Sequence, residues 1–259
     1  MLVNISPVGE ADSHVSFFSA GDGAVTALAR GLRKPASKLA ASLLPADELN
    51  VRLAEGRGRR KILTGVTITR SHAEWRAELD LLALYWFMAE CLYLSAGEPE
   101  INAAMYRLVV NMLRSTPAVA ARYSAVAVYA LKLQKLHGLL PDLAHCALDG
   151  HSLADDEPVH LLPSGEGIIG REAYNRHYAR TGGGLIRLEA ERLRRWRRLL
   201  SGALLDYPQV PADEIDVALL VYHLARAVGD IAGRSLNSAA YMRTQWKLPD
   251  ISELLQAQL

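Results

Sequence analysis

The pattern of apolar residues changes once along the chain, near Arg70, and this change most constrains the fold. Before Arg70, short runs of alternating or β-branched residues are separated by glycine-containing turns. After it, long apolar runs with helical spacing follow one another. We therefore predict an α+β protein, with a β-domain over residues 1–70 and an all-helical domain over residues 71–259.

Five strands are predicted in the β-domain, at about 2–6, 14–19, 24–30, 48–56 and 61–69. Gly21-Asp22-Gly23 marks one hairpin turn and Gly56-Arg57-Gly58 marks another. Five short strands bury their apolar faces best in a small barrel, and the OB-fold is a common five-stranded barrel. The prediction is an N-terminal five-stranded OB-fold barrel.

Helices are predicted in the second domain, separated by one irregular segment. A capping box of Ser71 and Glu74 is expected to begin the first helix, which continues to about Leu94. The others are expected at 101–115, from Thr116-Pro117 to about 137, and at about 185–203 and 213–230. Residues 138–184 are rich in Gly, Pro, His and Asp and are expected to be irregular.

The charge is unevenly distributed, although the formal net charge is only +1. Residues 1–70 contain ten Lys/Arg and six Asp/Glu, so a basic small domain precedes a mildly acidic remainder. This favours a polyanionic partner for the β-domain.

The composition favours a cytoplasmic protein. The two cysteines, Cys91 and Cys146, cannot form a disulfide framework, which suits a reducing cytosol. The first residues lack the basic flank and apolar stretch of a signal peptide. The most apolar run, 79–94, is too short to span a bilayer and contains two acids, so we expect a core helix and no membrane association.

No catalytic arrangement stands out, and we expect no enzyme activity. The eight histidines are scattered without HExxH spacing, and no hydroxyl lies in a GxSxG setting. Thr181-Gly-Gly-Gly184 before a helix would suit a nucleotide phosphate, but it lacks the P-loop frame, and a hinge is favoured. Around Cys146, the stretch 145–151 offers half of a zinc site at most, and a structural turn is favoured.

Two basic clusters in the β-domain predict a nucleic-acid surface. The first contains Arg30, Arg33, Lys34 and Lys38, with no acid among them, and the second contains Arg57, Arg59, Arg60 and Lys61. Two cationic loops on one barrel predict a groove for a nucleic-acid backbone rather than ordinary solvated charge.

A third group of cations lies on the helix predicted over 186–200, which has six arginines and two glutamates. At helical spacing, Arg187, Arg194 and Arg198 fall on one face. This face either extends a DNA path or pairs with acids elsewhere in the protein, and the sequence does not choose between the two.

Three segments together resemble RecO, the family of bacterial recombination mediators. They are GAVTALARGLRKPASKLAASLLP (23–45), YALKLQKLHGLLPDLAHCALDG (129–150) and GRSLNSAAYM (233–242). The resemblance covers nearly the whole chain. It implies a DNA-repair protein without catalytic activity, bound to the nucleoid, that binds single- and double-stranded DNA and anneals complementary strands. It also implies RecR and the C-terminal tail of single-strand-binding protein as partners, and RecA indirectly.

The resemblance also carries one departure. Some family members bind zinc through two CxxC pairs, whereas here Cys146 alone remains, with Asp149, Gly170 and Ala173 at the other positions. We therefore expect no metal and no cofactor. Phe17 and Phe18 are expected to divide between core and surface, which leaves backbone electrostatics to dominate over base stacking.

A second class of function stays open on the residues alone. A non-catalytic interaction scaffold would use the same cations to bind acidic protein tails instead of DNA.

Overall fold

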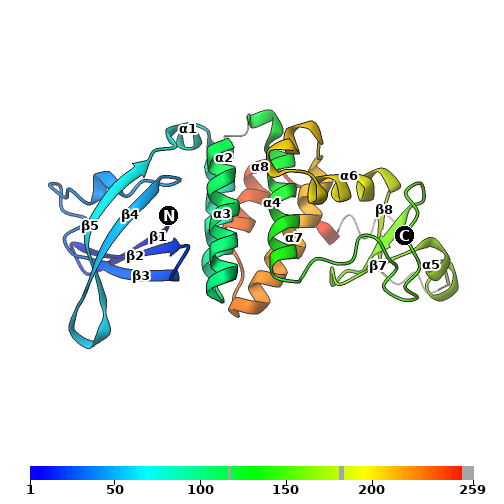
Figure 1. The fold of residues 1–259 in the computed structure, drawn as a ribbon, viewed down its shortest axis with the longest axis horizontal. Coiled ribbons are helices and arrows are strands. Elements are labelled where there is room, and N and C mark those ends of the chain that lie inside the picture. Colours follow the sequence, from blue (N-terminus) through cyan, green and yellow to red (C-terminus); the bar gives the residue numbers. More distant parts are fainter. Residues whose placement is uncertain (116–117, 181–183, 253–259) are drawn as a thin grey trace. The chain divides into compact units, whose positions relative to one another are not determined.

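The computed structural model describes residues 1–115, 118–180 and 184–252, which fall into two compact units (Figure 1). The first unit comprises Met1–Val119 with Val228–Met242, and the second comprises Ala120–Ala227 with Arg243–Leu259. The predicted boundary at Arg70 marks the end of the last strand of the first unit, and this unit continues beyond it through three helices.

The first unit contains all five predicted strands, which confirms that part of the fold. They are β1 (Leu2–Val8), β2 (Asp12–Ser19), β3 (Gly23–Ala29), β4 (Glu48–Glu55) and β5 (Lys61–Arg70). The strand order is β1-β2-β3-β5-β4, with antiparallel pairing except between β3 and β5. Among the described residues no β1–β4 pairing is recorded, and closure into a barrel stays a prediction.

Strand β2 is buried on both faces. Phe17 belongs to the apolar core of the sheet, together with Val15 and Leu63, whereas Phe18 faces the opposite way and is fully buried. The helices α2 (Leu79–Leu94) and α3 (Pro99–Ser115) contact β2 and cover that second face. The expectation that one of the two phenylalanines is exposed is therefore wrong, because helices cover the side that a free barrel would leave to solvent.

The first predicted helix is broken into two, α1 (Ala73–Ala77) and α2, by the extended backbone of Glu78. The predicted capping box is also wrong: the residue before α1 is His72, and no side chain caps it. The hydroxyl of Ser71 donates instead to Asp47 Oδ1 at 3.0 Å. Asp47 is fully buried and also binds the amide of His72 and the guanidinium of Arg76, so a tertiary contact fixes the start of α1.

Helix α2 is buried nearly all round, as the composition of 79–94 predicts. Nine of its residues are buried, and they surround the helix except along one stripe that includes Leu79, Leu82 and Trp86. None of the helices in the described part of the chain is long and apolar enough to cross a membrane.

The second unit contains α4 (Arg122–Leu136), α6 (Ala190–Ser201) and most of α7 (Glu214–Ala232). Helix α4 packs against α6. The short helix α8 (Asn237–Trp246) follows α7. The predicted helices at 101–115 and 213–230 are confirmed, and the helix predicted to begin at Thr116-Pro117 corresponds to α4, although those two residues lie outside the described part of the chain.

The all-helical prediction needs one correction in this unit. A three-stranded sheet, in the order β7-β6-β8, is formed by β6 (Val159–Leu161), β7 (Ile168–Ile169) and β8 (Ile186–Leu188), and α5 (Arg171–His177) lies between the last two. The helix expected from about 185 therefore begins only at Ala190. Two- and three-residue strands that pair over long sequence distances leave no periodic pattern from which to predict them.

Candidate nucleic-acid interface

The first basic loop, residues 30–38, leaves β3 and is held firmly at its base. Gly31 has a φ of +64° and donates its amide to Asp12 Oδ1 at 2.7 Å. The amide of Arg33 donates to the Ala11 carbonyl at 2.9 Å, and the side chain of Leu32 is buried in the core of the sheet. The loop is thus fastened to the β1–β2 turn while its cations remain exposed.

Arg33 extends along the β1–β2 turn, where its Nη1 donates to the Gly9 carbonyl at 3.2 Å. This bond uses one of the five guanidinium N–H groups, so the others remain free to bind an anion. Lys34 and Lys38 are exposed on the same loop. A ligand that meets this loop therefore meets cations whose backbone is already ordered.

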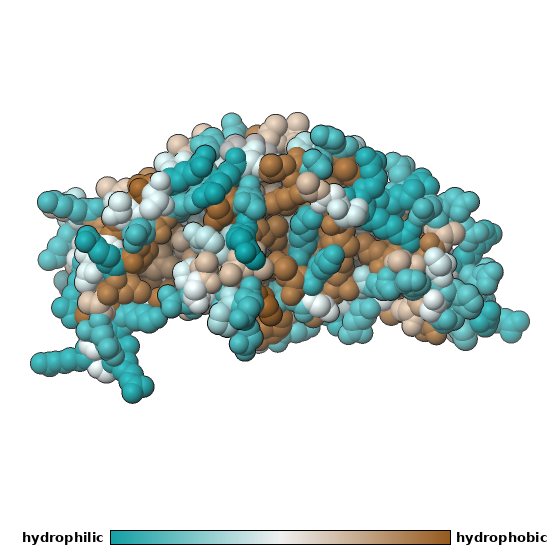
Figure 2. All heavy atoms as spheres, viewed as in Figure 1, coloured by the Kyte–Doolittle hydropathy of each residue, from teal (hydrophilic) through white to brown (hydrophobic). Residues whose placement is uncertain are grey.

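The second basic loop, residues 57–61, forms the tip of the β4–β5 hairpin. A 3₁₀ turn spans Arg57–Arg59, in which Gly58 and Arg59 both have positive φ, at +69° and +60°. Figure 2 shows hydrophilic side chains projecting from this tip, which is at lower left in both views (Figures 1 and 2). The predicted turn is confirmed, and it displays all its cations to solvent.

The two basic loops are attached to two neighbouring strands, β3 and β5. The parallel pairing of β3 with β5 places Leu28 beside Ile62. Arg30 follows Leu28 by two residues and Lys61 precedes Ile62, so both loops are anchored within two residues of this pair. Because the pairing is parallel, the two loops leave it in opposite directions. Only the tertiary pairing brings these segments, about thirty residues apart in sequence, together.

No carboxylate of the described residues lies within ion-pair distance of the eight cations predicted in these two loops. Two of the six acids of the β-domain form ion pairs elsewhere: Asp47 binds Arg76, and Glu48 binds Arg114 at 2.7 Å. Uncompensated cations on ordered loops produce a positive potential, which attracts a polyanion and binds its phosphates.

The structure divides the arginine-rich segment between the strand β8 (Ile186–Leu188) and the helix α6. Arg187 lies on β8 and not on the helix, so the prediction that it shares a helical face with Arg194 and Arg198 is wrong. Arg194 and Arg198 lie one turn apart on α6, and Arg194 donates to the Asp155 carbonyl at 2.7 Å. Whether they contact DNA stays a prediction.

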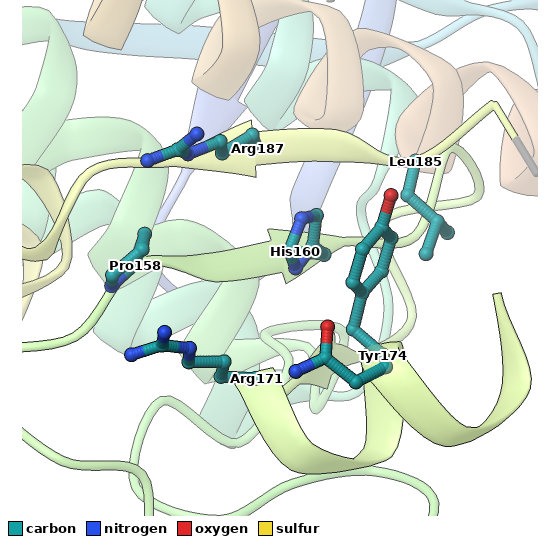
Figure 3. Close-up of a pocket in the computed structure, with 7 residues that line it drawn as sticks. Pro158, His160, Arg171, Tyr174, Leu185 and Arg187 are labelled. Carbon is teal, nitrogen blue, oxygen red and sulfur yellow. The ribbon is translucent and has the colours of Figure 1, made fainter. Parts of the chain in front are cut away.

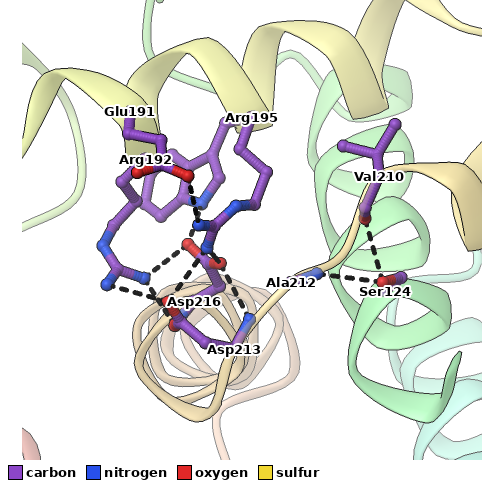
Figure 4. A network of polar contacts seen from close by, with 9 residues as sticks. Ser124, Glu191, Arg192, Arg195, Val210, Ala212, Asp213 and Asp216 are labelled. Atoms are coloured by element: carbon purple, nitrogen blue, oxygen red, sulfur yellow. Dashed lines mark hydrogen bonds and ion pairs between the residues drawn. The ribbon is translucent and has the colours of Figure 1, made fainter. Parts of the chain in front are cut away.

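The other arginines of α6 are structural. Arg192 and Arg195 both bind Asp213 and the fully buried Asp216, which also accepts a hydrogen bond from Trp196 Nε1 at 2.8 Å (Figure 4). Arg197 donates to the Leu143 carbonyl at 2.8 Å and pairs with Asp155. The sequence left open whether the arginines of this helix pair with acids elsewhere in the protein. These three arginines do.

The electrostatics of this network follow from its burial. Burial by itself would raise the pKa of Asp213, but hydrogen bonds from Arg192, the Asp216 amide and Arg195 outweigh it and lower the pKa to about 2. Asp213 is therefore ionised at neutral pH. Its ion pairs and those of Asp216 compensate the charges of Arg192 and Arg195 inside the protein. These two arginines are not available to a nucleic acid.

The positions that correspond to zinc ligands in the resemblance do come together. Cys146, Asp149, Gly170 and Ala173 all line one cavity of about 300 Å³. Asp149 accepts a hydrogen bond from the His151 amide at 3.2 Å, as in an ordinary turn. Within the described residues no three Cys, His, Asp or Glu side chains gather to hold a metal ion, and glycine and alanine supply no ligand.

Two features of the site have no clear mark in the sequence. Asp12 fixes the first basic loop, yet it is a single acid at the first residue of β2, and no motif around it marks that role. The β7-β6-β8 sheet, which carries Arg187, lies in the segment predicted to be irregular. Its one sequence indication is the alternation of Val159, His160 and Leu161 between two prolines. The glycine-rich stretch 181–183 lies outside the described residues.

Comparison with known proteins agrees with this architecture. The family model for the N-terminal part of recombination protein O matches residues 2–72, and the model for its C-terminal part matches residues 76–202. A DNA repair protein RecO from Nocardioides sp. is 29% identical over 173 residues, which cover 65% of this chain and 70% of the relative. Another from Symbiobacterium thermophilum is 26% identical over 238 residues, which cover 87% of this chain and 90% of the relative.

Proposed function

The chain belongs to the RecO family of DNA repair and recombination proteins, and on that premise we propose that its two basic loops bind the backbone of single- and double-stranded DNA. Family membership implies DNA and the recombination machinery as partners, and a mediator that is generally not catalytic. The finer proposal is that the protein anneals complementary strands. With RecR it helps RecA to load on DNA coated by single-strand-binding protein, whose C-terminal tail it contacts.

The observation that carries the DNA-binding proposal is the pair of ordered, exposed and uncompensated basic loops. Loops 30–38 and 57–61 are attached to the neighbouring strands β3 and β5, where Leu28 pairs with Ile62. Their cations find no carboxylate within ion-pair distance among the described residues. Such a surface recognises phosphates, whatever the base sequence.

Burial of the aromatic residues supports a mode of binding without sequence preference. Phe17 and Phe18 are both buried, so neither offers a stacking platform on the sheet. Contacts to the phosphate backbone then supply most of the free energy of binding, and this term falls steeply with salt. Binding of this kind is compatible with strand annealing, because the bases remain free to pair.

The proposal is tested by fluorescence-anisotropy titration of a mixed-sequence single-stranded oligonucleotide at several salt concentrations. The wild-type protein is compared with Arg33→Ala/Lys34→Ala. The double variant is expected to bind more weakly, with a salt dependence flatter by on the order of one unit of slope, because about two phosphate contacts are lost.

The matched control is Arg70→Ala/Arg107→Ala, which removes the same charge from exposed positions of the first unit outside the basic loops. If the two double variants lose the same oligonucleotide affinity, binding depends only on the net charge of the protein, and the role of the loop is overturned. Absence of binding by the wild-type protein at low salt would overturn DNA binding itself. An acidic peptide would then be titrated, to test the scaffold alternative.

A further inference from the structure

A cationic cavity of about 510 Å³ lies in the second unit beside the β7-β6-β8 sheet (Figure 3). Its lining includes Arg171 and Tyr174 from α5, His160 from β6 and Arg187 from β8. In the view of Figure 3, the two arginines extend toward the same side of the cavity, and Tyr174 stands at the other. Two cations, an aromatic wall and an amide, from Asn175, therefore meet in one hollow.

One wall of the cavity is a stacked pair of rings. The rings of His160 and Tyr174 stack with their centroids 3.7 Å apart and an angle of 5° between their planes. Burial, and then the charge of Arg187, lower the pKa of His160, so that its imidazole is neutral. The imidazole of His160 therefore adds no positive charge to the cavity, and the cations that line it are the two arginines.

Both arginines have acidic neighbours, yet both stay open to solvent. Arg171 lies 3.6 Å from Glu157, and Arg187 lies 3.1 Å from Glu189; the two guanidinium side chains are 60% and 52% exposed. Ion pairs this exposed contribute little to stability. A phosphate can therefore exchange with these carboxylates at little cost, and a guanidinium binds phosphate through two parallel hydrogen bonds.

We propose that the cavity lined by Arg171, Tyr174, Asn175 and Arg187 binds one nucleoside phosphate. The two arginines hold the phosphate, and the base lies against the walls of the cavity, where the amide of Asn175 can contact its edge. The volume is well above that of a phosphate alone and within the range of small-molecule sites. The nucleoside phosphate is either a free mononucleotide or an unpaired nucleotide of a strand, and both sources present the same groups.

This inference goes beyond the proposed function, because the cavity lies in the second unit and not in the basic loops. It also gives Arg187 a role different from the one predicted for it. Arg187 acts with Arg171 across the cavity, and not with Arg194 and Arg198 along a helix.

The test uses the full chain and two probes, deoxythymidine monophosphate and a short oligothymidylate. Binding of each probe is followed by the NMR signals of ¹³C-labelled histidine side chains, with the His160 signal assigned from His160→Gln. Both probes are expected to shift the His160 signal. Arg171→Ala/Arg187→Ala is expected to weaken mononucleotide binding at least about tenfold, as removal of arginine–phosphate contacts does.

The control is Arg176→Ala/Arg180→Ala, which removes the same charge from exposed residues of the same region outside the cavity lining. It is expected to change mononucleotide binding less than about threefold, because neither arginine lines the cavity and exposed charges at a distance are screened. Thermal unfolding of both variants checks that the fold is kept, and Asn175→Ala gives a second test if either is unstable.

The outcomes separate this inference from the proposed function. Equal weakening by the two double variants, or no shift of His160 with either probe, would overturn the inference. Oligonucleotide binding that persists without a His160 shift would leave DNA binding by the basic loops intact. A third outcome separates the two proposals in the other direction. If only Arg171→Ala/Arg187→Ala loses mononucleotide binding, and the wild-type protein does not bind oligonucleotides, the nucleoside-phosphate site is supported and the proposed function is contradicted.

Discussion

Gly165 packs so closely against the ring of His223 that a Cβ atom at position 165 would collide with Nδ1 of the imidazole. His223 is only 7% exposed, and both of its ring nitrogens are buried without a hydrogen-bond partner among the described residues. Burial, and then the charge of Arg226, lower the pKa of His223 to about 4. The folded protein therefore holds a neutral histidine where the unfolded chain has one that titrates normally.

This histidine predicts a loss of stability in mild acid. The unfolded state takes up a proton near pH 6.5 and the folded state only near pH 4, so the free energy of unfolding falls as the pH drops through that window. The loss is on the order of 3 kcal/mol. Urea unfolding of the wild type and His223→Leu between pH 7.5 and pH 4 measures it. The other histidines are present in both proteins and contribute equally to the pH dependence of each. If the free energy of unfolding falls equally with pH in both proteins, the prediction is contradicted.

The same contact predicts that Gly165→Ala is unusually destabilising. Gly165 has a φ of +77°, and the added methyl group meets the imidazole of His223. Gly150→Ala is the matched control, because Gly150 has a φ of +72° but no atom within 4 Å of the Cβ position. Strain alone costs about 1 kcal/mol, and overpacking adds about 1–3 kcal/mol at position 165. Equal midpoints of urea unfolding for the two variants would show that the contact is not tight.

Asp216 is predicted to be the most sensitive acid of the second unit. Arg192 and Arg195, which are 14% and 16% exposed, each pair with the carboxylates of Asp213 and Asp216. Asp216→Asn removes one of these two negative charges. Removal of one partner of a buried pair costs about 3–5 kcal/mol. Glu191→Gln, which alters only an exposed pair with Arg195, should cost less than about 1 kcal/mol. Chemical unfolding of both variants is the measurement, and similar losses would contradict the structural role given to Asp216.

The hairpin tip is predicted to contribute to DNA binding independently of the first loop. Arg59→Ala/Arg60→Ala should weaken binding of a single-stranded oligonucleotide and reduce the slope of log affinity against log salt by about 1.4, since each lost phosphate contact removes about 0.7. Combination with Arg33→Ala/Lys34→Ala should give additive losses. Anisotropy titrations measure both. An unchanged slope in the hairpin variant would remove the tip from the interface.

Several parts of the protein were determined by the sequence itself. The five strands, the change to helices near Arg70 and the buried helix over 79–94 follow from patterns that repeat within a few residues. The eight cations of the two basic loops are exposed, because glycine-containing turns place seven of them outside the strands and Lys61 at the first residue of β5. Local periodicity and turn chemistry decide such features before any tertiary contact forms.

Tertiary structure alone decided the rest, because it depends on groups far apart in the chain. Buried Asp47 binds Ser71 across 24 residues and overrides a capping box that is locally favourable. Buried Asp216 draws Arg192 and Arg195 inward, although their neighbours on the same helix look identical in sequence. The pairing of β6 with β8 places Arg187 at a cavity with Arg171. A buried charge must find its partner wherever the fold supplies one, and no local pattern records that choice.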